Sequence, residues 1–162
     1  MKKETHISYE YFNNNAELND IEQKLFAKAK EARENAYAPY SNFLVGCSVL
    51  LENGEIYTGN NQENAAYPSG LCAERVALFY ANAQFPDIAV RAIAIAAFSG
   101  ENFVASPITP CGSCRQVILE SENRFGNKIS IYMYGTECIN HIEDAGQLLP
   151  LKFEKRSLDN HQ

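Results

Sequence analysis

Two short cysteine motifs, separated by an apolar stretch, constrain this chain more than any other feature. The first is Cys72-Ala73-Glu74 and the second is Pro110-Cys111-Gly112-Ser113-Cys114. Three thiolates suit a tetrahedral zinc ion, and no fourth candidate ligand clusters with them, so one coordination position is left for water. A fold that uses both motifs must therefore bring two distant segments together around one catalytic metal.

Both motifs are predicted to begin helices. Residues 72–83 have apolar side chains at helical spacing and stop before Pro86, and residues 111–124 are closed by Gly126. Helix N-termini carry partial positive charge and free N–H groups, which stabilise thiolates. Because zinc with three thiolates is anionic, further positive charge is expected near the sulfurs. Arg75 and Arg115 are the candidates to hydrogen-bond them, although both could instead be solvated or paired with acids.

Glu74 lies two residues from the first cysteine and is the candidate proton carrier for the water. It could also be an ordinary acid in the first turn of a helix, where the dipole favours it. The metal has rivals as well. Cys111 and Cys114 could form a redox pair without Cys72, and a closed structural site would need a remote ligand from the three histidines of the chain, which are His6, His141 and His161.

The remaining pattern predicts alternating strands and helices. An amphipathic helix is expected over 19–36, followed by strands over 43–51 and 55–60 that are joined at Asn53-Gly54 by a type I′ hairpin turn. Apolar residues 90–98 and residues 128–134 are predicted as buried strands. Strands that alternate with helices imply parallel pairing, crossover helices and a layer on each face of the sheet.

Composition favours one cytoplasmic domain with a small-molecule partner. The 162 residues carry a net charge of −6 with scattered Lys and Arg, so we expect neither a nucleic-acid surface nor a membrane-binding patch. The N-terminus lacks an apolar signal core, and no apolar run is long enough to span a bilayer. Five cysteines suit a reducing compartment, in which Cys47 and Cys138 are expected to be ordinary small buried residues.

Residues 20–153 resemble the zinc-dependent cytidine deaminase family, chiefly of the type that acts on free nucleosides. The Cys72-Ala73-Glu74-Arg75 and Pro110-Cys111-Gly112-Ser113-Cys114 motifs carry the resemblance. Asn61-Gln62-Glu63-Asn64 resembles the family's sugar-binding segment, and Tyr40-Ser41-Asn42-Phe43 resembles its pyrimidine-binding stretch. Asn60 departs from the family pattern, in which a cysteine is common at this position. Zinc deaminases with three cysteine ligands and a general acid–base glutamate are an established class.

The resemblance implies a three-layer α/β/α fold with a mixed sheet of about five strands. Residues 19–156 would form the catalytic domain and 157–162 a tail, and the 1–18 extension would form an edge strand or a loose arm. Zn²⁺ would be held by Cys72, Cys111 and Cys114. By the same resemblance, the substrate contacts would come from Asn61 and Glu63 to the ribose, Phe43 and Ala73 to the base, Thr109 to the leaving amine, Tyr67 to a neighbouring subunit's pocket, and Phe153 as a closing aromatic.

Taken alone, Asn61 and Glu63 would be solvated residues at a strand end, and Phe43 and Tyr67 would be core residues. With the resemblance, we expect hydrolytic deamination of cytidine and deoxycytidine in pyrimidine salvage by a homotetramer. One alternative is a deaminase of a nucleoside antibiotic such as blasticidin S, which would not need the sugar-binding segment. Another is a non-catalytic zinc-stabilised nucleoside-binding protein. A deaminase of polynucleotides would more usually show a basic groove and a histidine in place of Cys72.

Overall fold

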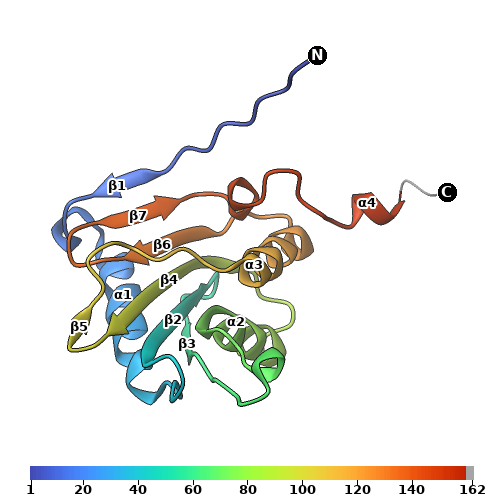
Figure 1. Ribbon diagram of the computed structural model, residues 1–162. Helices are drawn as coiled ribbons and strands as arrows, with labels where there is room; N and C mark the ends of the chain where they lie inside the picture. The colour runs from blue at the N-terminus through green and yellow to red at the C-terminus, as the bar shows by residue number, and fades with distance from the viewer. Residues whose placement is uncertain (160–162) are drawn as a thin grey trace.

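A mixed sheet of seven strands forms the centre of the computed structural model, which describes residues 1–159 (Figure 1). Six strands lie in the order β1-β7-β6-β4-β2-β3, and β5 pairs with the end of β4. β4 and β6 are parallel, and the other pairs are antiparallel. The strands are β1 (Glu10–Phe12), β2 (Phe43–Leu51), β3 (Ile56–Asn60), β4 (Val90–Ser99), β5 (Asn102–Phe103), β6 (Ser130–Tyr134) and β7 (Ile139–Ile142).

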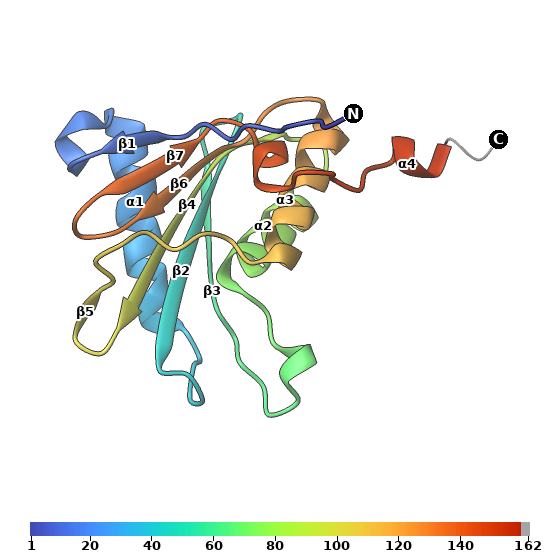
Figure 2. The same ribbon diagram turned by 45° about the horizontal axis from the view of Figure 1, so that its top comes forward.

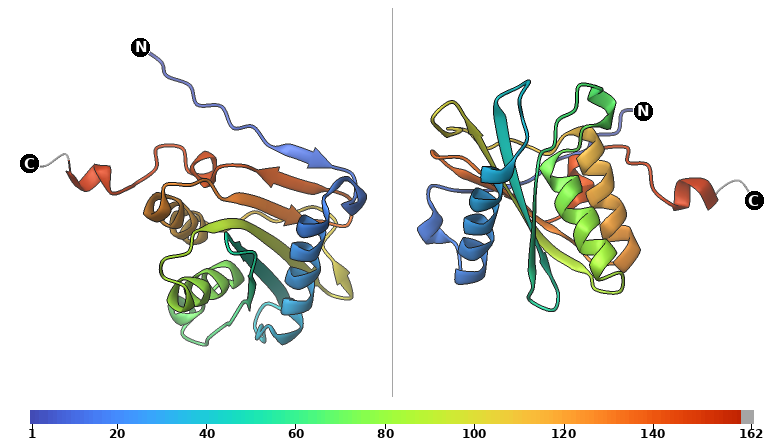
Figure 3. Two further views of the ribbon diagram at one scale, coloured as in Figure 1. Left: turned by 180° about the vertical axis from the view of Figure 1, so that it is seen from behind. Right: turned by 90° about the horizontal axis from the view of Figure 1, so that it is seen from below.

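Helices cover both faces of this sheet, as predicted. α1 (Asp20–Ala32) lies on one face, whereas α2 (Ala73–Gln84) and α3 (Gly112–Phe125) lie side by side on the other (Figure 3). Within residues 1–159, no helix is both long and apolar enough to cross a bilayer. The remaining helical turns are η1 (Asn15–Glu17), η2 (Arg33–Asn35), η3 (Tyr67–Ser69), η4 (Ala145–Leu148) and α4 (Arg156–Asp159). Of the predicted tail 157–162, residues 160–162 lie outside the described part of the chain.

Local sequence explains most of these elements. Asn19 and Glu22 form a capping box that begins α1, and the buried side chains of this helix include Leu25 and Phe26. The predicted 19–36 helix ends as an α-helix at Ala32 and continues through η2, whose hydrogen bonds are tighter. β2 has the predicted bounds, and the other predicted strands and helices agree within two residues.

The hairpin between β2 and β3 forms with a different turn from the predicted one. Leu51 N–H donates to the Glu55 carbonyl and Gly54 N–H donates to the Leu51 carbonyl, which closes a three-residue loop. Gly54 has a φ of 87°, whereas a type I′ turn would need positive φ at Asn53 as well. Asn53 instead uses its side-chain oxygen to accept from Glu55 N–H. The type I′ prediction was therefore wrong, and a three-residue loop with one left-handed glycine replaces it.

The sheet has seven strands where about five were expected, because the two short strands β5 and β7 were missing from the prediction. β5 has two residues and β7 has four, so neither offers a long apolar or alternating pattern. β1 occupies the sheet edge against β7, with Glu10 opposite His141, and the Glu10 carboxylate lies 2.7 Å from His141 Nδ1. The N-terminal extension thus contributes an edge strand at residues 10–12, while residues 1–9 lie outside regular elements and are exposed.

Close contacts hold the helices against the sheet. The largest core lies between the sheet and the pair α2 and α3, and a second core lies under α1. A Cβ atom on Gly59 would lie 2.4 Å from Ala77 N in α2, and one on Gly46 would lie 1.9 Å from the Ala29 carbonyl oxygen in α1. Only glycine permits this approach. The segments before β2 and before α2 extend together beyond one end of the sheet (Figure 2).

Candidate metal centre and adjoining pocket

Three thiols from the two predicted motifs meet at one point. Cys72 is the N-cap of α2, Cys111 is the N-cap of α3, and Cys114 lies in the first turn of α3. Their sulfurs all lie within 4.8 Å of one another, with 3.7 Å between Cys72 and Cys111 and 3.4 Å between Cys111 and Cys114. A tetrahedral zinc ion with bonds of about 2.3 Å would space its sulfur ligands by about 3.8 Å. The cluster therefore fits zinc.

The strand directions bring the two helix starts together. β3 and β4 are both antiparallel to β2 and so run the same way, and each leads to a helix on the same face of the sheet. The N-termini of α2 and α3 consequently lie at the same end of the sheet, beyond the C-terminal ends of β3 and β4. Neither Cys72 nor Cys111 makes a side-chain capping bond to its helix. Both thiols are therefore left available to a metal, at the positive ends of two helices.

Electrostatics favour a thiolate at Cys72. Hydrogen bonding from Cys114, supported by hydrogen bonds from Arg75 and Cys111, lowers the pKa of Cys72 to about 5. The pKa of the Cys114 thiol is correspondingly raised, because it hydrogen-bonds Cys72 and is buried. Nη2 of Arg75 lies 3.9 Å from Cys72 Sγ, which is the contact expected for this residue. The cluster is thus prepared for negative charge before a metal binds.

Arg115 has different partners from those predicted for it. Its guanidinium donates from Nε to the Pro110 carbonyl over 2.7 Å, from Nη1 to the Leu148 carbonyl over 3.1 Å, and from Nη2 to Thr109 Oγ1 over 2.9 Å. Arg115 therefore supports the segment that precedes Cys111 and does not hydrogen-bond the sulfurs. The carbonyl of a residue far along the chain attracts this side chain, a contact that sequence spacing does not reveal.

Glu74 is a buried carboxyl beside the thiol cluster. It is 5% exposed and follows Cys72 within the first turn of α2. Burial raises the pKa of Glu74 above its ordinary value, and the negative charge on Cys72 adds to the rise. A carboxyl with a raised pKa gives up and takes back a proton more readily near neutral pH. Its position and its pKa both suit a proton carrier.

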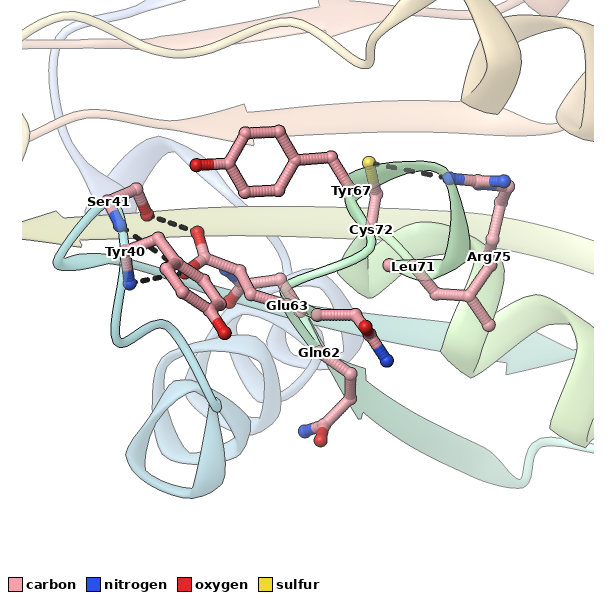
Figure 4. Close-up of a pocket in the computed structure, with 11 residues that line it drawn as sticks. Tyr40, Ser41, Gln62, Glu63, Tyr67, Leu71, Cys72 and Arg75 are labelled. Carbon is pink, nitrogen blue, oxygen red and sulfur yellow. Dashed lines mark hydrogen bonds between the residues drawn. The ribbon is translucent and has the colours of Figure 1, made fainter.

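An open pocket of about 520 Å³ adjoins Cys72 (Figure 4). Five of the predicted site residues line it, and these are Asn61, Glu63, Tyr67, Cys72 and Arg75. Six further residues complete the lining, and these are Tyr40, Ser41, Gln62, Asn64, Gly70 and Leu71. The pocket thus joins the segment after β3, the loop before β2 and the start of α2. Motifs that are far apart in the sequence form one concave surface.

Glu63 is held by the loop before β2. Its Oε1 accepts from Ser41 Oγ over 2.5 Å, and its Oε2 accepts from Tyr40 N–H over 2.9 Å and from Ser41 N–H over 3.3 Å (Figure 4). These bonds, the Ser41 hydroxyl first, lower the pKa of Glu63. An ionised carboxylate has about four acceptor positions, so one remains for a ligand. Ser41 and Tyr40 were not predicted as partners of Glu63, because nothing in the local pattern pairs them.

Asn61 continues the pairing between β2 and β3 with its side chain. Its Oδ1 accepts from Val45 N–H over 2.8 Å and its Nδ2 donates to the Phe43 carbonyl over 2.9 Å. Each amide atom keeps one further hydrogen-bonding position. The side chain is therefore fixed by the strand and still able to bind a ligand.

The other predicted substrate contacts lie outside the pocket lining. Phe43 is half-buried and packs against the larger core, and Ala73 is fully buried. Thr109 is exposed, and Phe153 is 59% exposed.

Two core assignments also differ from the prediction. Tyr67 is 75% exposed and lies edge-on to Tyr40, with 5.9 Å between the ring centroids, so it is not a core residue. Cys47 is buried as expected, whereas Cys138 is only half-buried.

Comparison with known proteins identifies relatives of the whole arrangement. Residues 19–127 match the family model described as the cytidine and deoxycytidylate deaminase zinc-binding region. The cytidine deaminase of Sporosarcina psychrophila is 43% identical over 141 residues, which cover 86% of this chain and 95% of that protein. The cytidine deaminase of Halalkalibacterium halodurans is 45% identical over 60% of this chain and 70% of its own length.

Solved structures show the same fold. The crystal structure of cytidine deaminase from Burkholderia pseudomallei superimposes with a TM-score of 0.68 at 38% identity, covering 80% of this chain and 97% of that one. The cytidine deaminase from Mycobacterium tuberculosis gives a TM-score of 0.62 at 31% identity, covering 81% and 95%. Both likenesses extend over almost the full length of the solved chains.

The thiol cluster predicts which cysteines hold metal. Cys111→Ser should lower zinc content well below one ion per chain, because a neutral hydroxyl is a poor substitute for a thiolate and only two sulfur ligands would remain. Cys138→Ser is the matched control, since Cys138 lies outside the cluster, and it should keep its zinc. Elemental analysis of the purified proteins makes the comparison. Full zinc content in Cys111→Ser would contradict the assignment.

Proposed function

Since the chain belongs to the cytidine and deoxycytidylate deaminase family, we propose that it hydrolyses cytidine and deoxycytidine to uridine and deoxyuridine with release of ammonia. The observation that supports this most strongly is the group of three thiols beside one buried carboxyl, Glu74, with Cys72 of this group on the wall of an open pocket. The zinc-binding domain, the protonatable group and the concave surface are the three parts that such a hydrolysis requires.

The chemistry divides between the metal and Glu74. Cys72, Cys111 and Cys114 would hold the zinc ion, which as a Lewis acid would make water a nucleophile near neutral pH. The Glu74 carboxylate accepts one proton from the water that attacks C4 and passes it to N3 of the pyrimidine. It then accepts the second proton from the new C4 hydroxyl and passes it to the amine, which leaves as ammonia when the C4–N bond breaks. Arg75 and the two helix ends offset the negative charge of the thiolates. Burial of Glu74 helps it to act both as base and as acid.

The nucleoside would lie in the pocket with its sugar on Asn61 and Glu63. Each of these side chains is fixed by protein hydrogen bonds and keeps a free hydrogen-bonding position, so both are pre-organised for a sugar hydroxyl. Phe43 would pack on the base, Ala73 N–H would bind its O2 carbonyl, and the Thr109 carbonyl would bind the leaving amine. These contacts require the substrate to extend beyond the open pocket towards the thiol cluster.

A homotetramer would complete the site. The pocket is open, and its rim carries exposed Tyr40 and Tyr67. Phe79 and Tyr80 on α2 are 47% and 52% exposed, which is unusual for neighbouring aromatics of a monomer surface. Packing between copies would cover these rings and bring Tyr67 and Phe153 to neighbouring pockets. All five cysteines are free thiols, which suits a reducing cytoplasm. Deamination of free nucleosides there would serve pyrimidine salvage.

Glu74→Gln should retain zinc and lose nearly all deamination. The amide keeps the shape of the side chain but cannot carry protons, and general acid–base groups contribute about a hundred- to ten-thousand-fold. Loss of cytidine absorbance measures the rate. Glu120→Gln, on an exposed position of α3, is the control and should match the parent. A Glu74→Gln rate within about tenfold of the parent rate would remove Glu74 from this role.

Glu63→Ala should lower kcat/KM for cytidine by about ten- to a hundredfold, because a charge-assisted hydrogen bond to a sugar hydroxyl is lost. Cytosine nucleosides with and without the 3′ hydroxyl provide the test. The parent should handle the analogue without it poorly, and the substitution should then cost little more.

Ser41→Ala tests whether Glu63 acts by binding the sugar or by holding the loop before β2 in place. It removes the shortest contact that Glu63 makes with the loop but keeps the carboxylate. It should cost much less than Glu63→Ala. Equal losses in the two variants would show that Glu63 acts only by holding the loop.

The substrate itself separates the two deaminase functions. Turnover of blasticidin S without turnover of cytidine would favour the antibiotic deaminase instead.

The assembly is measured by sedimentation velocity of the zinc-loaded protein. A single boundary at the mass of four chains is expected, since a neighbouring copy would cover the exposed aromatics of α2. A monomer with full cytidine deaminase activity would contradict the proposed tetramer.

A further inference from the structure

Helix α3 holds the C-terminal segment as well as two of the three thiols. Glu122 Oε1 accepts from Ala145 N–H over 2.9 Å at the start of η4, and Arg115 Nη1 donates to the Leu148 carbonyl over 3.1 Å at its end. Gln116 Nε2 then donates to the Phe153 carbonyl over 2.9 Å. In Figure 1 this segment passes α3 and then leaves the body of the protein towards α4. One helix therefore carries both metal ligands and the supports of the last part of the chain.

Beyond η4, the segment makes few hydrogen bonds to the rest of the protein. Leu151 has a φ of 58° and is fully exposed, so the chain turns there without burying the side chain. The hydrogen bonds within 154–158 are local, joining Ser157 N–H to the Glu154 carbonyl and Leu158 N–H to the Lys155 carbonyl. Among the described residues 150–159, the only hydrogen bond to the rest of the protein is the one from Gln116. Gln116 thus supplies the hydrogen-bonded link at the Phe153 backbone, beside the packing of the Glu154 side chain, which is 11% exposed.

Gln116 lies on the same helix as two of the proposed metal ligands and close to them in sequence. It lies two residues after Cys114 on α3, and its neighbour Arg115 also binds the Thr109–Pro110 segment that leads into Cys111. A rigid helix that places two thiols therefore also places the Phe153 backbone. The Phe153 ring is 59% exposed and does not line the pocket of its own chain, so it is available to a neighbouring copy.

We propose that Gln116 is a positioning residue that fixes the C-terminal segment to the metal-bearing helix, and that it sets the location of the Phe153 ring for closing a nucleoside pocket. The proposal rests on the deaminase function and on Phe153 as the closing aromatic. Closure of a pocket by an aromatic stabilises bound substrate and transition state alike, so loss of the support raises KM more than it lowers kcat.

The first test is steady-state kinetics of the zinc-loaded, assembled Gln116→Ala protein with cytidine. KM should rise about fivefold, as expected for the loss of one neutral hydrogen bond, while kcat stays within about twofold. Zinc content should stay at the parent value. Glu120→Ala is the matched control, because it lies one turn further along the same helix and is exposed. Gln116→Lys keeps an N–H donor and should recover most of the parent KM.

A double-mutant cycle tests whether Gln116 acts through Phe153. If it does, adding Gln116→Ala to Phe153→Ala should raise KM little further, because the ring that Gln116 locates is already absent. KM increases that multiply would overturn the proposal, since Gln116 would then act on the site by another route.

Tryptic cleavage provides a readout that does not depend on activity. Lys152, Lys155 and Arg156 lie in the supported segment, so cleavage there should be faster in Gln116→Ala than in the parent or in Glu120→Ala. Faster cleavage with an unchanged KM would overturn the role in closing the pocket. Unchanged cleavage would overturn the support itself. Absence of cytidine turnover in the parent would instead overturn the proposed function, and cleavage alone would then decide whether Gln116 holds the segment.

Discussion

The convergence of two helix N-termini on three thiols is the constraint on which the rest of the structure depends. Cys72 and Cys111 occupy the N-cap positions of α2 and α3, and their sulfurs lie 3.7 Å apart although 39 positions separate them in the sequence. Three thiolates at this distance repel one another unless positive charge is present. The two helix dipoles and Arg75 supply that charge. The strand directions that place these helices side by side are therefore a requirement of the site as well as of the fold.

Two polar side chains in the pocket beside this centre hydrogen-bond the protein and still keep positions for a ligand. Asn61 and Glu63 line the pocket and satisfy backbone groups of β2 and of the loop before it, which leaves only their remaining hydrogen-bonding positions free. A side chain fixed in this way loses little conformational entropy on binding. Arg115 and Gln116 extend the same arrangement to the C-terminal segment. The residues nearest the chemistry thus also determine the local order of the chain.

Elements with strong local patterns could be predicted from the sequence, and those without could not. β2 has the predicted bounds because seven of its nine residues are hydrophobic, and α2 and α3 begin at the predicted cysteines. β7 and β5 were missed because two to four residues carry no usable period. The type I′ turn was wrong because Asn-Gly also suits a three-residue loop, and only the observed hydrogen bonds distinguish the two.

The sequence by itself determined the chemistry of the centre. Three thiols of the kind that suits zinc, a carboxyl two residues from the first of them and an arginine beside it follow from residue types and spacing, since these are local properties. Only the tertiary structure decided the partners of Arg115, Glu63 and Gln116. Their hydrogen bonds join residues 33, 22 and 37 positions apart, in the Leu148, Ser41 and Phe153 contacts. Such pairs become neighbours only when the sheet and helices have packed, because no local preference acts over that separation.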